Sequence, residues 1–149
     1  MNTQQIATRL TELCSQGKFE AAQKELFAED AVSIEPNATP DFPKETKGLR
    51  AIIEKGHKFE SMVEKIHGVS TSAPLVTGNA IAIALTMDVT MKGRGRVKLE
   101  ELCAYEVKDG KPDLINFQLR DGTYVIPKVI DHGYVEIGKH KLGFDRTAK

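Results

Sequence analysis

The chain has 149 residues, which is enough for one domain with a hydrophobic core, and 40% hydrophobic with 28% charged residues is ordinary for a globular protein. Basic and acidic residues number 21 each, so no net charge attracts nucleic acid or an anionic membrane surface. No apolar run approaches the roughly 20 residues of a membrane helix, and the first residues lack a signal-peptide pattern. We therefore expect a cytoplasmic protein with neither a nucleic-acid nor a membrane partner.

The first half of the chain predicts three helices. Ile6, Leu10 and Cys14 repeat at helical spacing before Gly17, which suits the left-handed position after a helix. A second helix is expected over residues 19–28. A wide apolar stripe predicts a third over residues 48–66. Between them, residues 31–35 read as a short strand and residues 37–45, which contain two prolines, as a loop.

The second half is organised around a hairpin over residues 79–107. Its first arm alternates between two faces, which is typical of a strand in two different environments. One face carries larger apolar side chains and the other smaller or polar ones. The first set is Ile81, Ile83, Leu85, Met87, Val89 and Met91; the second begins Ala80, Ala82, Ala84 and Thr86. A glycine-rich turn over residues 92–96 connects the arms.

Further strands are expected over residues 67–76 and 114–120, so helices precede an antiparallel meander in an α+β arrangement. The pattern changes after residue 123. We predict a C-terminal extension over residues 124–149. A small edge hairpin would use residues 125–130 and 134–137, followed by a mobile tail over residues 140–149.

Four segments resemble the nuclear transport factor 2-like superfamily, in its SnoaL-like and ketosteroid isomerase-like branch. They are residues 26–36 (LFAEDAVSIEP), 47–52 (KGLRAI), 76–79 (VTGN) and 101–110 (ELCAYEVKDG). The resemblance covers residues 1–123. It implies a cystatin-like, cone-shaped domain in which a curved antiparallel sheet wraps around three helices and leaves an apolar internal pocket.

In such a domain Ile83, Leu85 and Met87 would line the pocket. The resemblance also implies a homodimer formed through the outer face of the sheet, where the small row of alanines would suit the contact. Its members bind small apolar or polycyclic molecules, and several isomerases, cyclases and hydratases among them use acid-base chemistry with no cofactor. Others only bind ligands or proteins, so fold does not fix function.

Glu35 lies where the ketosteroid isomerases carry their general base, just before Pro36. It is the candidate catalytic residue, a carboxylate that would accept and return a proton at the pocket mouth. The alternative is a solvated carboxylate at a strand end. The positions of the isomerase's electrophilic tyrosine and aspartic acid fall near Leu10 and Cys103, and neither can donate a strong hydrogen bond to an oxyanion. Steroid isomerisation is therefore not expected.

Glu101 is a carboxylate in the apolar row that includes Leu99 and Cys103. If the alternation holds it faces the interior, where it must be paired or neutral. The alternative is a β-bulge that turns it outward, toward Arg94 or Arg96.

His57, Cys103 and Tyr105 are further candidate polar residues of the pocket. His57 borders the apolar stripe of the third helix, where a partly buried structural role is the competing interpretation. Cys103 has no readable base partner, which favours core packing. The histidines and cysteines show no metal-ligand spacing, so we predict neither a metal nor a cofactor. Whether the chain is an enzyme or a non-catalytic binding or interaction domain stays open at this point.

Overall fold

Three helices form where the apolar spacing predicts them. In the computed structural model, which describes residues 1–108, 110–119, 128–130, 134–137 and 140–143, they are α1 (Thr3–Ser15), α2 (Phe19–Leu26) and α3 (Leu49–Met62). Asn2 and Gln5 form a capping box at the start of α1. Gly17 follows α1 with φ of 71°, a left-handed conformation that glycine adopts without a Cβ clash.

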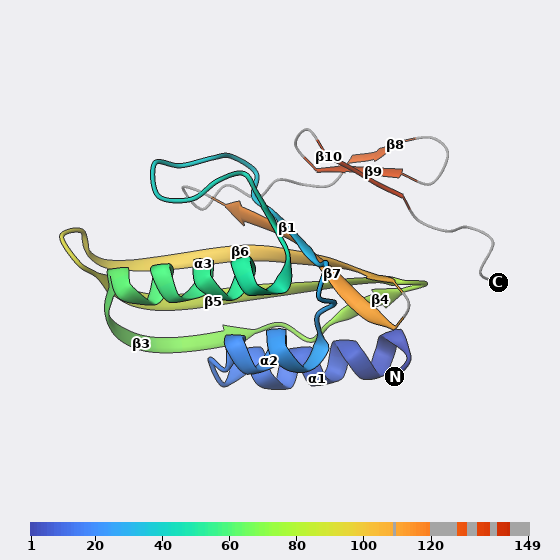
Figure 1. Ribbon diagram of the computed structural model, residues 1–149, viewed down its shortest axis with the longest axis horizontal. Coiled ribbons are helices and arrows are strands. Elements are labelled where there is room, and N and C mark those ends of the chain that lie inside the picture. The colour runs from blue at the N-terminus through green and yellow to red at the C-terminus, as the bar shows by residue number, and fades with distance from the viewer. Residues whose placement is uncertain (109, 120–127, 131–133, 138–139, 144–149) are drawn as a thin grey trace.

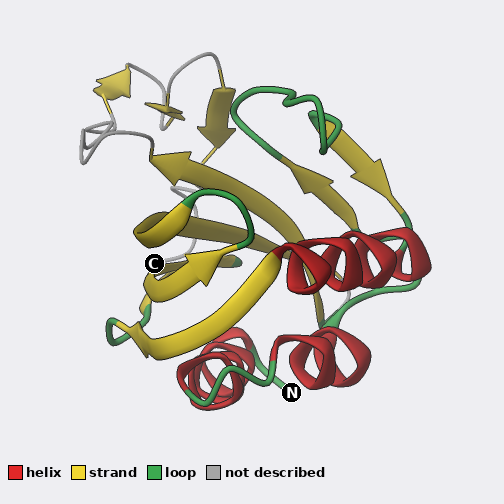
Figure 2. Ribbon diagram, turned by 90° about the vertical axis from the view of Figure 1, so that its left-hand side faces the viewer, coloured by secondary structure: helices red, strands yellow, loops and turns green. Residues whose placement is uncertain are grey.

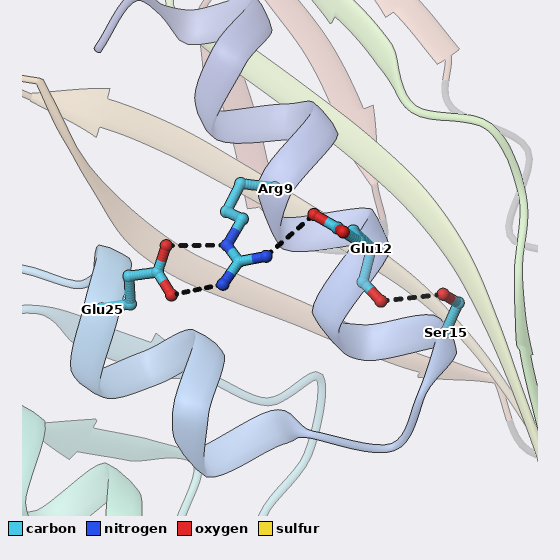
Figure 3. A network of polar contacts seen from close by, with 4 residues as sticks. All are labelled: Arg9, Glu12, Ser15 and Glu25. Carbon is cyan, nitrogen blue, oxygen red and sulfur yellow. Dashed lines mark hydrogen bonds and ion pairs between the residues drawn. The ribbon is translucent and has the colours of Figure 1, made fainter.

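An ion-pair network holds α1 against α2 on the outside of the domain (Figure 3). The Arg9 guanidinium donates to both carboxylate oxygens of Glu25, at 2.7 and 3.0 Å, and to Glu12 on its own helix at 2.9 Å. These side chains are more than one-third exposed, so water screens the attraction and the network fixes orientation more than it adds stability.

The predicted third helix is too long. It ends at Met62, and Val63–Thr71 forms strand β3, which pairs antiparallel with β5. Val63 and Ile66 continue the helical spacing, but pairing with a neighbouring strand decides their conformation, because tertiary contacts override local periodicity. Ile66 is 52% exposed in this strand rather than part of an inward helical stripe.

Seven strands form the main sheet, in the order β2-β1-β7-β6-β5-β3, with β4 also paired to β5. Pairing is antiparallel except between β1 and β7. The remaining strands are β1 (Val32–Ile34), β2 (Glu45–Lys47), β4 (Leu75–Thr77), β5 (Ala80–Met91), β6 (Gly95–Lys108) and β7 (Lys111–Leu119). The predicted loop over residues 37–45 therefore runs into an unpredicted strand, β2.

The β5–β6 hairpin has the predicted alternation and an unbroken register from Ala80↔Glu106 to Met91↔Gly95. These are the two longest strands, side by side in Figure 1. The larger apolar side chains of β5 are buried against the helices, including the predicted lining residues Ile83, Leu85 and Met87. Because no register shift occurs beside Glu101, the β-bulge interpretation is wrong, and this carboxylate keeps the inward parity of Cys103 and Tyr105.

Figure 2 shows the main sheet strongly bent, with the three helices grouped on one side of it. The α+β fold class is therefore confirmed. The inward side chains of β5 and β6 meet those of α1, α2 and α3 in one hydrophobic cluster. Any functional group on the inner face of this sheet is consequently held in an apolar environment.

The C-terminal extension contains a separate three-stranded sheet in the order β10-β9-β8. β8 (Lys128–Ile130) and β9 (Tyr134–Ile137) pair antiparallel as predicted, and residues 125–127 of the predicted first arm lie outside the described residues. β10 (His140–Gly143) pairs antiparallel with β9, so this part of the predicted tail is a strand. The other residues predicted in the tail, 144–149, lie outside the described residues.

Candidate functional site

Strand β1 presents polar side chains to the interior. Ser33 is completely buried, whereas its neighbours Val32 and Ile34 are only partly buried. Glu35 follows two residues later and shares the face of Ser33. Its side chain is 17% exposed. The predicted catalytic carboxylate therefore lies at the margin of the core and is not a solvated group at a strand end.

Lys55 is the partner that sequence reasoning missed. Its ammonium donates to Ser33 Oγ and to Glu35 Oε1, each at 2.8 Å, and its side chain is 16% exposed. On α3 it lies three residues after the buried Ile52 and four before Phe59, which packs against the core. A lysine at helical spacing within an apolar stripe is the signal that could have identified it.

Glu101 lies on the inner face of β6, opposite the buried Leu85 of β5. Burial, and to a smaller extent the Glu35 charge, raise the pKa of its carboxyl group to about 7. The Lys55 charge and the Cys103 thiol act in the opposite direction. Cys103 Sγ lies 3.9 Å from Glu101 Oε2 and donates a weak hydrogen bond to it. Glu35, Lys55 and Glu101 are thus one electrostatic cluster, assembled from the residue that follows β1, from α3 and from β6.

Thr46 of β2 adds a hydroxyl group beside this cluster. It is directly opposite Ser33 in the β1–β2 pair, and it is 8% exposed. Within the described part of the chain, Thr46 Oγ1 is the one buried side-chain oxygen or nitrogen atom without a hydrogen-bond partner. A buried hydroxyl group without a partner is costly, so a native protein that keeps one calls for an explanation.

Cys103 and Tyr105 are both buried on the inner face of β6, and burial raises the pKa of each well above its ordinary value. The Tyr105 ring also packs edge-to-face on Phe27, with ring centroids 6.2 Å apart. The thiol and the phenol therefore stay protonated at neutral pH, as core residues do. Cys14, on α1, is similar: burial raises its pKa to about 12.

His57 lies at the surface of the domain. Its side chain is 53% exposed, and Nε2 lies 2.7 Å from Glu20 Oε2 on α2. Position 57 is two residues beyond Lys55 on α3, so it points about 200° away around the helix axis. The predicted candidates thus divide: the structure brings Glu35, Glu101, Cys103 and Tyr105 inside and leaves His57 outside.

In the described ranges no three histidine, cysteine, aspartate or glutamate side chains gather closely enough to hold a metal ion. No helix in the same part of the chain is both long and apolar enough to cross a membrane.

Comparison with known protein families shows that residues 1–118 match the family model of the SnoaL-like domain. A candidate SnoaL-like polyketide cyclase from Mesorhizobium loti is 30% identical, with a TM-score of 0.72 and coverage of 80% of this chain and 100% of that one. No curated protein sequence matches the chain.

Two more distant solved structures are similar in fold alone. A cystatin-like protein of unknown function from Xanthomonas campestris is 18% identical, with a TM-score of 0.66 and coverage of 80% and 92% of the two chains. A candidate isomerase from Bacillus subtilis is 19% identical, with a TM-score of 0.61 and coverage of 80% and 90%. The cystatin-like and nuclear transport factor 2-like fold predicted from the sequence is confirmed.

Proposed function

We propose that this chain, which belongs to the SnoaL-like domain family, binds a small, mostly apolar or polycyclic molecule and exchanges protons with it. The molecule would lie between the helices and the inner face of the sheet, against Ile83, Leu85 and Met87. Buried carboxyl groups would supply the acid-base chemistry without a cofactor. Isomerisation, cyclisation and hydration all need this chemistry.

The observation that carries the proposal is the position of Glu101 on the inner face of β6, opposite the buried Leu85. A general acid-base group works best when its pKa lies near the operating pH, and burial brings the pKa of Glu101 to about 7. Glu35, the position indicated by the family resemblance, holds Lys55 through its carboxylate. We therefore propose that Glu101 moves the proton and that Glu35 sets the charge around it.

The outer face of β5 supports a second element of the proposal, a homodimer. Its small row of Ala80, Ala82, Ala84 and Thr86 points away from the core. An isologous contact brings the same surface of two copies together, and small side chains allow two sheets to approach closely.

Proton exchange at carbon tests the proposed function. The probe is 2-tetralone, a fused-ring ketone with acidic hydrogens, followed by proton NMR in deuterated buffer. Wild type should accelerate deuterium incorporation, whereas Glu101→Gln should bind the ketone and lose the acceleration. Glu100→Gln is the matched control, because Glu100 is the next residue on β6 and faces the opposite side.

Two results would contradict the proposal in different ways. Saturable binding without any acceleration would leave a ligand-binding domain and remove the enzymatic claim. No saturable binding of either 2-tetralone or 2-naphthol to the wild type would remove the small-molecule claim altogether.

A further inference from the structure

Gly56 lies in the middle of the face that α3 turns toward the core. Successive residues of an α-helix are about 100° apart around its axis, so Gly56 falls between Leu49 and Ile52 when the helix is viewed along that axis. Those two side chains are only 7% and 1% exposed. Less than one turn further along, Phe59 packs against the hydrophobic cluster, so α3 still lies on the core beyond Gly56. A residue in this position is expected to be closely surrounded.

The surroundings of Gly56 are instead open. The residue is partly exposed. Apart from its two chain neighbours and the nearby backbone of α3, no heavy atom of the described ranges lies within 4 Å of where its Cβ would be. A Cβ at Gly17, by comparison, would contact Val69 Cγ2 at 3.8 Å. Open space therefore lies against the inward face of α3 at Gly56.

The fold itself does not require a glycine at this position. Gly56 does not have a positive φ, so any other L-residue except proline could adopt its backbone conformation. The open space would also accommodate a Cβ without a clash. Glycine inside a helix is less stable than alanine, because its backbone loses more conformational entropy on folding. Glycine therefore destabilises α3 slightly, and what it provides is the open space.

We propose that Gly56 determines which ligands fit: the space beside it receives the second ring of a fused-ring molecule, so that the chain selects fused-ring over single-ring compounds. This inference rests on the proposed function and deepens it, because it narrows the substrate class. The space suits an apolar ring because the apolar residues Ile52 and Phe59 lie on either side of Gly56 on the same face of α3. A ring placed there would leave water without displacing any protein side chain.

The space at Gly56 lies beside the charged cluster. Lys55 directly precedes Gly56 and points about 100° away around the helix axis, where its ammonium donates to Ser33 and Glu35. A molecule whose second ring fills the space would therefore extend next to the cluster. The size of the ligand and its chemistry would thus be controlled from adjacent positions of α3.

Phenol and 2-naphthol test the inference, because they share a hydroxyl-bearing ring and differ by one fused ring. Wild type should bind 2-naphthol about 10- to 30-fold more tightly than phenol in NMR titrations, owing to the apolar surface that the second ring buries. Leucine adds about as many carbon atoms to position 56 as the second ring adds to phenol. Gly56→Leu should therefore remove most of this preference and leave the phenol affinity nearly unchanged.

Two further variants keep the result interpretable. Glu54→Leu introduces the same side chain about 200° away around α3, at a position that is 64% exposed, and should keep the preference of the wild type. Gly56→Ala fills less of the space and suits the helix. It should raise the melting temperature by about 1–4 °C, yet weaken 2-naphthol binding about 2- to 4-fold. This variant carries the test if Gly56→Leu does not fold.

Nuclear Overhauser contacts locate the bound ring directly. In the wild type, protons of the second ring of 2-naphthol should show cross-peaks to the Hα protons of Gly56. The inference is overturned if these cross-peaks are missing, or if filling position 56 weakens the binding of phenol and 2-naphthol equally or of neither. Any of these results, together with Glu101-dependent exchange of 2-tetralone, would leave the proposed function intact.

Discussion

Replacing Glu101 with glutamine should remove a pH dependence from the stability of the fold. The folded carboxyl group keeps its proton up to a pKa of about 7, whereas the unfolded chain releases it near the ordinary value of 4.5. Between these values the unfolded state binds fewer protons than the native state, so stability falls as pH rises. Glutamine has a similar shape and no charge, so the stability of Glu101→Gln should not show this fall with rising pH.

The size of the effect follows from the two pKa values. Each pKa unit corresponds to about 1.4 kcal/mol, so the wild type should lose about 3 kcal/mol relative to Glu101→Gln between pH 4.5 and pH 7. The difference in unfolding free energy between the wild type and Glu101→Gln should be small and constant below pH 4.5. Above pH 7 it should level off, because both states of the wild type are then ionised.

Urea unfolding of both proteins at intervals across this range measures the difference, since the other titrating groups cancel between them. Glu100→Gln again serves as the control on the outer face of β6, and its curve should run parallel to that of the wild type. Parallel curves for Glu101→Gln as well would refute the reasoning, because they would mean that Glu101 titrates alike in the folded and unfolded states.

Three further outcomes are expected. Lys55→Met should lower the free energy of unfolding by about 3–5 kcal/mol, because it leaves Glu35 buried without its partner. Adding Glu35→Gln to this variant should recover much of the loss. If the double variant loses as much as Lys55→Met alone, the two side chains are not coupled. Ala82→Arg should convert the proposed homodimer into a monomer in sedimentation experiments, and a dimer mass that survives this change would place the interface elsewhere. Cys103 in the native protein should resist alkylation by iodoacetamide at neutral pH because burial keeps its thiol protonated, and rapid labelling at this residue before unfolding would contradict that account.

The fold was largely predictable from local patterns. The alternation from Ala80 to Met91 and the helical spacing of Ile6 and Leu10 each follow from one element's periodicity, and both are confirmed. The end of α3 could not be predicted in this way, because Val63 continues the helical pattern of the sequence but pairs with Met91 of β5. Pairing between distant segments leaves no mark on the spacing within one segment.

The site was predictable only in part, for the same reason. Glu101 stood out because a carboxylate interrupts an apolar row. Lys55 did not, because its partner Glu35 lies 20 residues earlier in the sequence, and only the fold brings the two side chains together. The parallel pairing of Ser33 with Leu114 brings β1 beside β7 and so fixes the position of Glu35 near β6. No local pattern specifies that crossover.

Titration of the Glu101 carboxyl carbon by NMR tests the central claim most directly, in the wild type and in Glu35→Gln. We predict a midpoint near pH 7 in the wild type and a lower one in Glu35→Gln, where a neighbouring negative charge is lost and the Lys55 charge remains. Glu106→Gln, a partly buried position on the same strand, should leave the midpoint unchanged. A wild-type midpoint near 4.5 that does not respond to Glu35→Gln would show that the two carboxyl groups do not share one site, and it would contradict the proposed function.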